Sequence, residues 1–234
     1  MKPDYRKTFR AAFTASVPVM AGYVVLGIAF GILLRDKGYG FLWALAMSLF
    51  IYGGSMQFIA IGLLDAGASL VSTALITLLV HARHLFYGIS MLTRYQDTGA
   101  YRPYLIWALT DETYALVVNG APEGCSEREY YFFLSLLDQS YWVLGSLLGS
   151  LIGSALNFDT AGIDFAMTAL FVTIFTEQFL TMKDHVPAMI GVGVSVLCLV
   201  FFGPDRFLIP SMLLISALLS LYGNLQSRPA AERR

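Results

Sequence analysis

The sequence predicts an all-α, polytopic helical membrane protein, and three observations lead to that prediction. Of its 234 residues, 57% are hydrophobic and only 13% are charged, about half the charged fraction of an average soluble domain. The mean hydropathy is +0.66. Two runs, Ala11–Leu34 and Phe41–Leu64, each extend for 24 residues without a charge, which exceeds the roughly 20 residues needed to cross a hydrocarbon core. A bilayer is therefore the natural solvent for this chain.

The first apolar run follows Lys2, Arg6, Lys7 and Arg10, as the core of a signal peptide would. Its length exceeds the roughly 7–15 residues of such a core, so we expect a retained first helix. Further windows predict helices at Ala66–Val80, Tyr104–Asn119, Tyr131–Leu156, Phe165–Met182, Val186–Phe202 and Phe207–Tyr222. No linker rich in Pro, Gly or Ser divides them, which predicts a single integral membrane domain over residues 1–234.

The composition argues against several other classes of protein. The net charge is −1 and no basic stripe follows the chain, so nucleic-acid binding has little support. Cys125 and Cys198 form neither a disulfide framework nor a metal-binding pattern. We therefore expect no metal and no cofactor.

An internal repeat indicates how the helices are organised. A shift of 121 residues aligns Leu49-Phe50-Ile51 with Leu170-Phe171-Val172, and Ser90-Met91-Leu92 with Ser211-Met212-Leu213. The units would cover about 17–93 and 138–214, with an unmatched linker helix at about 103–119. Three crossings, one linker and three crossings give about seven transmembrane helices and place both units in the same orientation, as in parallel-repeat transporters.

The charges at the two ends bear on the topology. The basic N-terminus predicts a cytoplasmic location by the positive-inside rule. Arg228, Arg233 and Arg234 favour the same side for the other end, which requires an even number of crossings. The repeat implies seven and the charges prefer eight, so the side of the C-terminus stays open.

Three potentially cationic residues, His81, Arg83 and His84, lie in an apolar stretch. A charge there costs roughly 2.5–3.5 kcal/mol on insertion scales, so it persists when paired, hydrated or functional. In a continuous helix the two histidines share a face and Arg83 does not. The repeat aligns this segment with Phe202-Gly203-Pro204-Asp205, which favours a helix break at both places, the sequence mark of a transporter binding site.

Two other interpretations of this segment are a turn at the membrane surface with a snorkelling cation and a zinc site. The zinc site is disfavoured because no HExxH motif or cysteine ligand supports it.

Asp111 and Glu112 are adjacent carboxylates inside an apolar window. Like charge and burial both favour the protonated form of such a pair, which suits a proton relay or an ammonium site. Alternatively, the pair lies at the frayed end of a short helix. Asp138 lies well inside the Tyr131–Leu156 window, where it either is structural or lines a pathway.

Gln57 and Gln178 occupy equivalent positions in the two units, and Glu177 stands where Met56 stands. The amides would face each other, where they bind a substrate or hold helices together. We expect this asymmetry, an acidic residue in one unit and a methionine in the other, to be functional. Small-residue spacing predicts packing faces rather than chemistry at Gly27, Gly31, Gly145, Gly149 and Gly153.

Three motifs in order, "QF" after a small-residue break, "ARHLFYG" and "LTDETYAL", resemble the AzlC family of branched-chain amino acid exporters over nearly the whole chain. The resemblance implies a bacterial cytoplasmic-membrane protein that exports valine, leucine or isoleucine together with a small AzlD-type membrane subunit. One position departs from the family, which usually has Asn before Ala-Arg-His where this chain has His81.

The expected function is thus a proton-coupled secondary transporter, with a non-transporting scaffold subunit and an intramembrane enzyme as alternatives. Arg83 is the natural partner of a substrate carboxylate because its guanidinium is a bidentate donor that stays charged. The expected substrate-binding residues are Arg83, His84, Gln57, Asp111, Glu177 and Gln178. The expected proton-coupling residues are His81, His84, Asp111, Glu112, Glu177 and Asp138.

Overall fold

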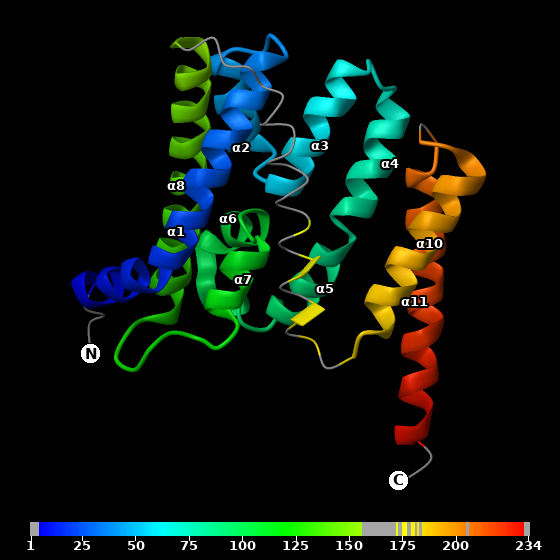
Figure 1. Cartoon of the computed structure of the whole chain (residues 1–234). Helices are drawn as coiled ribbons and strands as arrows, with labels where there is room; N and C mark the ends of the chain where they lie inside the picture. Colours follow the sequence, from blue (N-terminus) through cyan, green and yellow to red (C-terminus); the bar gives the residue numbers. More distant parts are fainter. Residues whose placement is uncertain are drawn as a thin grey trace. The chain divides into compact units, whose positions relative to one another are not determined.

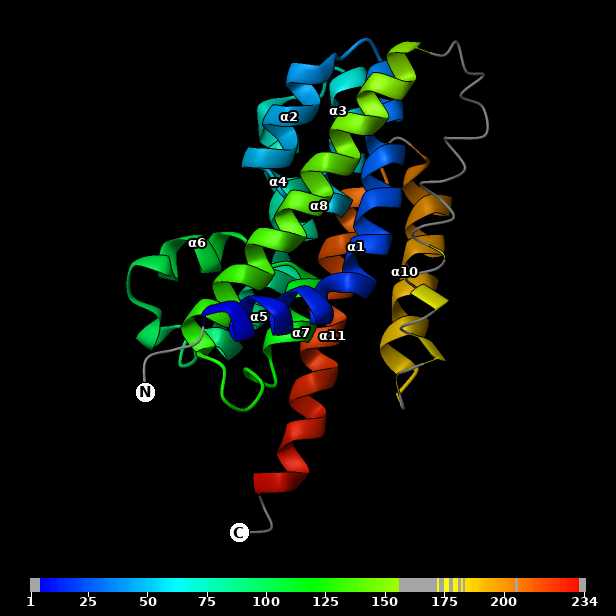
Figure 2. The same ribbon diagram turned by 90° about the vertical axis from the view of Figure 1, so that its left-hand side faces the viewer.

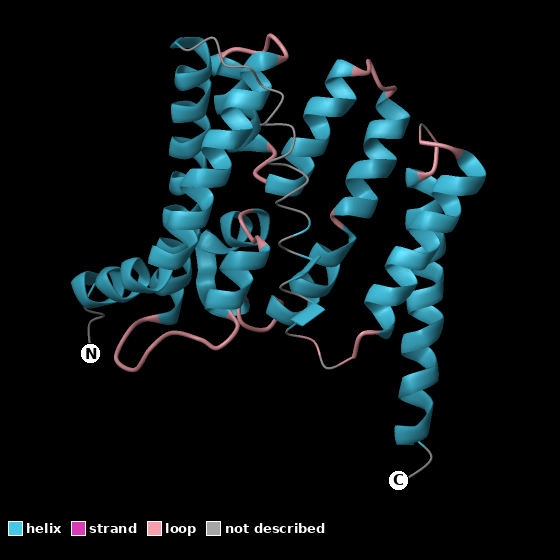
Figure 3. Ribbon diagram, viewed as in Figure 1, coloured by secondary structure: helices cyan, strands magenta, loops and turns pink. Residues whose placement is uncertain are grey.

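The computed structural model describes residues 5–155, 172, 175, 176, 179, 180, 182, 184–204 and 206–231. Over these residues the regular structure is entirely helical (Figure 3), so the all-α prediction is confirmed. The chain forms two compact units, Met1–Met167 and Thr168–Arg234. Each unit is described by itself below.

Two long helices, α1 (Tyr5–Asp36) and α8 (Glu127–Ala155), form the centre of the first unit. They lie side by side and run in the same direction (Figures 1 and 2). Their backbones meet at the predicted glycine faces: a Cβ on Gly27 would lie 2.9 Å from Ser146 N, and one on Gly145 would lie 2.8 Å from Val24 O. The packing role predicted for these glycines is confirmed, because no larger side chain fits this approach.

The first part of α1 lies at an angle to the rest of the helix (Figure 1). Pro18 lies inside α1, where its ring removes a backbone donor and kinks the helix. At this end of the unit an apolar core packs around the start of α8. Its buried residues are Ala12, Met91, Tyr95, Leu105, Leu109, Val117, Tyr130, Tyr131 and Leu134.

The apolar run Phe41–Leu64 is not a single crossing, as its length predicts, but a hairpin of α2 (Phe41–Phe50) and α3 (Gly54–Asp65) (Figure 1). Each helix is about 15–18 Å long at 1.5 Å per residue, roughly half a hydrocarbon core. The turn arises at Tyr52, whose φ is 41°, a strained left-handed conformation for an aromatic residue. Gly53 follows with extended backbone.

The break predicted at the histidine motif is confirmed. Helix α4 (Leu70–Val80) ends and α5 (Ala82–Met91) begins at His81, whose φ and ψ are −89° and 4°. His81 N donates to Thr77 O at 3.0 Å and His81 O accepts from His84 N at 2.9 Å. The residue thus closes one helix and opens the next.

A second interrupted segment replaces the linker helix expected over 103–119. A 3-10 helix η1 (Gln96–Tyr101) leads into α6 (Arg102–Trp107), and α7 (Asp111–Val117) follows after a turn. Thr110 is extended, and its hydroxyl caps α7 by accepting from Thr113 N at 3.3 Å. Because the Trp107 and Tyr52 rings lie 5.8 Å apart, this turn adjoins the turn between α2 and α3.

The second unit contains α10 (Val186–Phe202) and α11 (Leu208–Ala231), which pack against each other. Gly203 ends α10 with a φ of 74°, so the helix also breaks at the second predicted position. Asp205 lies outside the described residues.

By length and apolar composition, α1 is the one helix among the described residues that could cross a membrane unaided. Helices α2, α3, α4, α10 and the stretch Pro210–Gly223 are apolar but shorter. The number of crossings therefore stays a prediction.

Candidate functional site

A buried polar cluster forms where the α6–α7 turn meets α1. The Tyr23 hydroxyl donates to Glu112 Oε2 at 2.7 Å and lies 2.8 Å from Thr110 Oγ1. Because Tyr23 gives its one proton to Glu112 and Thr113 gives its one proton to Asp138, the Thr110 hydroxyl donates to one of these two residues at a time. Thr110, which caps α7, therefore also contacts Tyr23, the tyrosine that binds Glu112.

The cluster continues to Asp138 on α8. Thr110 Oγ1 lies 3.1 Å from Thr113 Oγ1, which donates to Asp138 Oδ2 at 2.7 Å. Asp138 is completely buried, and its Oδ1 makes no hydrogen bond to any described residue. A chain of four short oxygen contacts thus connects Glu112 with Asp138, two carboxylates that also interact electrostatically.

The turn between α2 and α3 lies close to this row of oxygen atoms. The Tyr52 side chain is 5% exposed, and its hydroxyl, which makes no hydrogen bond to any described residue, lies close enough to Asp138 and Glu112 to be affected by their charge. The strained backbone at Tyr52 therefore places a hydroxyl from a fourth segment near the two carboxylates. The cluster thus draws on α1, α7, α8 and the α2–α3 turn.

Gln57 lies next to the cluster rather than in it. Its Oε1 accepts from Trp142 Nε1 at 2.8 Å, and its Nε2 donates to Ser48 Oγ at 3.3 Å. The Trp142 ring packs edge-on against Tyr23, with centroids 5.5 Å apart. Gln57 is fully buried and holds α2, α3 and α8 together, which is the interhelical role that the sequence left open.

His81 and His84 contact each other, and His81 also contacts the α2–α3 turn. His81 Nδ1 and His84 Nδ1 are 3.3 Å apart. A Cβ on Gly53 would lie 2.7 Å from His81 Cε1, so His81 packs on the α2–α3 turn beside Tyr52. The α4–α5 break and the α2–α3 turn are therefore in contact.

The remaining predicted residues divide into two groups. Asp111 is the first residue of α7 and half-buried, beside Glu112. The side chain of Arg83 lies outside the described part of the chain, as do Glu177 and Gln178, so the roles given to them stay predictions. Among the described residues no group of three His, Cys, Asp or Glu could hold a metal ion.

Sequence reasoning missed Tyr23, Tyr52, Thr110, Thr113 and Trp142. Two local signals point to some of them. A threonine directly before Asp111-Glu112 is a typical N-cap, and a tyrosine before Gly53-Gly54 lies at a turn signal. Tyr23 and Trp142 carry no local signal, because only the packing of α1 on α8 brings them to the cluster.

Interrupted helices that meet around a buried carboxylate, Asp138, in a chain this apolar are typical of a helical membrane protein with a role in transport. Residues 18–156 match the family described as AzlC protein. The chain belongs to the AzlC family.

Several relatives cover most of the chain. A membrane protein of Helicobacter pylori strain 26695, described only as uncharacterized, is 46% identical over 220 residues, 94% of this chain and 96% of its own length. The branched-chain amino acid transport protein AzlC of Bacillus subtilis strain 168 is 41% identical over 214 residues, 91% of this chain and 84% of its own. The inner membrane protein YgaZ of Escherichia coli K12 is 28% identical over 180 residues, 74% of each chain. No solved structure matches the chain significantly.

Proposed function

We propose that the protein exports branched-chain amino acids such as valine, leucine and isoleucine across the bacterial cytoplasmic membrane, and that protons drive the export. The observation that carries the proposal is the oxygen chain between Glu112 and Asp138 at the meeting point of interrupted helices. The name of the Bacillus subtilis relative supports the substrate class.

The chain of hydroxyls supports proton coupling. Asp138, a carboxylate buried in an apolar unit, requires a positive charge nearby, and no lysine or arginine hydrogen-bonds to it in the described contacts. A proton or a substrate ammonium supplies that charge. Tyr23, Thr110 and Thr113 pass the proton from one carboxylate to the other by exchanging donor and acceptor roles.

The distribution of lysine and arginine in the first unit supports an orientation of the protein in the membrane. At the end of the first unit that carries the N-terminus, Lys7 contacts Glu123 O and Arg128 stacks on Tyr101, so α1, the 118–126 loop and η1 lie together there. Arg6 and Arg10 lie on α1, and Arg94 and Arg102 lie on either side of η1. Arg35 and Lys37 occupy the other end of α1. By the positive-inside rule the N-terminal end faces the cytoplasm.

The proposed transporter works with a small membrane subunit of the AzlD type and leaves its substrate chemically unchanged. It uses no cofactor. The partner is part of the proposal because the resemblance implies it, and co-purification with a small, very hydrophobic chain is its direct test.

Efflux from cells tests the function. A strain lacking this protein and a complemented strain are loaded with a valine-containing dipeptide, and released valine is measured over time with the partner present in both. The complemented strain should release valine faster and hold less inside. Equal efflux from the two strains would contradict the proposal.

A further inference from the structure

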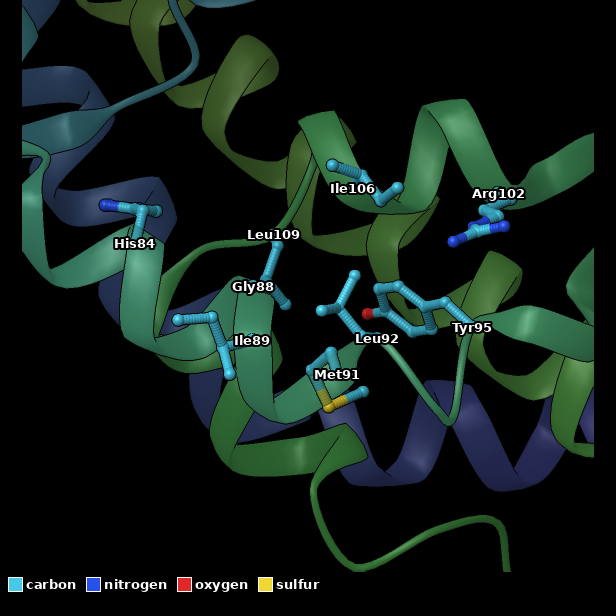
Figure 4. Close-up of a pocket in the computed structure, with 9 residues that line it drawn as sticks. All are labelled: His84, Gly88, Ile89, Met91, Leu92, Tyr95, Arg102, Ile106 and Leu109. Atoms are coloured by element: carbon cyan, nitrogen blue, oxygen red, sulfur yellow. The ribbon is translucent and has the colours of Figure 1, made fainter.

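A pocket lies between α5 and α6 (Figure 4). Its volume is about 330 Å³, which is within the range of small-molecule sites. It is lined by His84, Gly88, Ile89, Met91, Leu92, Tyr95, Arg102, Ile106 and Leu109. Most of this lining is apolar, and none of it is acidic.

Tyr95 gives the pocket a buried polar group. The residue is 2% exposed, and its hydroxyl makes no hydrogen bond to any residue in the described part of the chain. Figure 4 shows this hydroxyl pointing toward Leu92 and the interior of the pocket. The ring packs against Tyr131, with centroids 5.7 Å apart, so the hydroxyl is held in place. A buried hydroxyl without a partner is costly, and a ligand that bonds to it removes the cost.

Arg102 supplies a positive charge at the same pocket. It is the first residue of α6, and in Figure 4 its side chain lies on the Tyr95 side, while the ring of His84 lies at the opposite end. A guanidinium presents two parallel donors that match a carboxylate. With no acid among the lining residues, the charge of the pocket is complementary to an anion.

We propose that this pocket binds the carboxylate and the branched side chain of the transported amino acid. The proposal rests on the proposed function and names the site at which the substrate is recognised. Arg102 holds the carboxylate, the Tyr95 hydroxyl donates a further hydrogen bond to it, and Ile89, Leu92, Ile106 and Leu109 surround the apolar side chain. A lipid tail or an apolar helix fits this site less well, because neither satisfies Tyr95 and Arg102.

The position of the pocket links recognition to the carboxylates. Leu109 lines the pocket, and the next residue, Thr110, belongs to the oxygen chain. An occupant that moves the α6–α7 turn therefore changes the hydrogen bonds of Tyr23 and Thr113 as well. The pocket also lies at the end of the unit that carries the N-terminus, the side on which an exporter must load its substrate.

Competition experiments test the recognition. Labelled leucine is bound to the purified full chain, and two competitors are added in separate experiments. 4-Methylpentanoate lacks the amine of leucine, and leucinamide lacks its carboxylate. We expect 4-methylpentanoate to compete and leucinamide to be weaker by about 10-fold or more, the range of one or two charge-assisted hydrogen bonds. Leucinamide that competes as well as leucine would overturn the proposal.

Two variants test the assigned residues. Tyr95→Phe should weaken leucine binding by about 5-fold and Arg102→Gln by about 10- to 100-fold, while Arg102→Lys should retain part of the affinity. The matched control is Arg128→Gln, since Arg128 stacks over the Tyr101 ring at 4.7 Å and does not line the pocket. Melting temperatures of all variants show whether they fold.

The two proposals fail in different ways. If the unmodified protein neither binds nor exports leucine, the proposed function is wrong. If it does both, and folded Tyr95→Phe and Arg102→Gln variants behave like Arg128→Gln, the function stands and the substrate is recognised elsewhere.

Discussion

Asp138 combines complete burial with one oxygen that is hydrogen-bonded and one that is not. An ionised carboxylate in such a place is expensive unless a proton or another cation reaches it. The sequence indicated that Asp138 and Glu112 were unusual, because charges are rare in apolar windows. It could not show that Tyr23, Thr110 and Thr113 connect them.

Replacing Asp138 with asparagine should separate transport from proton coupling. The amide has nearly the same size but neither binds nor releases a proton near neutral pH. In liposomes, the variant should still exchange labelled leucine for unlabelled leucine, yet an opposing pH gradient should no longer drive net leucine movement. Asp65→Asn, at a surface ion pair with Lys37, is the control. A pH-gradient response equal to that of the unmodified protein would exclude Asp138 as the coupling residue.

Trp142 offers a test of stability at a single residue. Trp142→Phe removes the donor of Gln57 Oε1 and leaves a buried acceptor unsatisfied, which costs about 1–3 kcal/mol. The variant should unfold at a lower temperature in detergent. Trp43→Phe is the control because Trp43 is 50% exposed and should change the melting temperature little. Equal melting temperatures would show that the hydrogen bond to Gln57 contributes no stability.

At the level of elements, apolar length was a poor guide to crossings. The run Phe41–Leu64 is long enough for one helix, yet it folds as the α2–α3 hairpin because the chain turns at Tyr52 and Gly53. The predicted break at His81 is present, and the signals for it were the cationic residues themselves and the Gly203-Pro204 pair at the aligned position of the second unit. The α6–α7 turn was missed, although Thr110 followed by two acids is a helix-start signal.

The pairing of α1 with α8 rests on small residues and yields a prediction. A Cβ at position 31 would overlap the backbone of Ser146 and Ser150, so Gly31→Ala must push the helices apart and should cost about 1–3 kcal/mol. Gly22→Ala, on the same helix, meets nothing within 4 Å and should be neutral or slightly stabilising. Thermal unfolding of both variants in detergent checks this, and a neutral Gly31→Ala would contradict the packing.

For the whole molecule, the distribution of charge predicts which end of the first unit faces the cytoplasm. Cys125 lies in the loop at the N-terminal end, and Lys37 lies exposed at the other. With Cys198 replaced by serine, a membrane-impermeant maleimide should label Cys125 in inside-out vesicles only. A Lys37→Cys variant that also lacks Cys125 should be labelled in right-side-out vesicles only. The reversed pattern would invert the proposed orientation.

The sequence by itself determined that the chain belongs in a membrane, that it is helical, which family it resembles and where its unusual charges lie. Hydropathy, motif order and rare ionisable residues can be read from the sequence because they are properties of the linear chain. Only the tertiary structure decided which of those charges are neighbours. The oxygen chain from Glu112 to Asp138 joins α7 to α8 through Tyr23 of α1. The pocket of Tyr95 and Arg102 likewise needs α5 and α6 to pack together. Hydrogen bonds and cavities depend on distances of a few ångströms between residues far apart in sequence, and such distances exist only after the helices have packed.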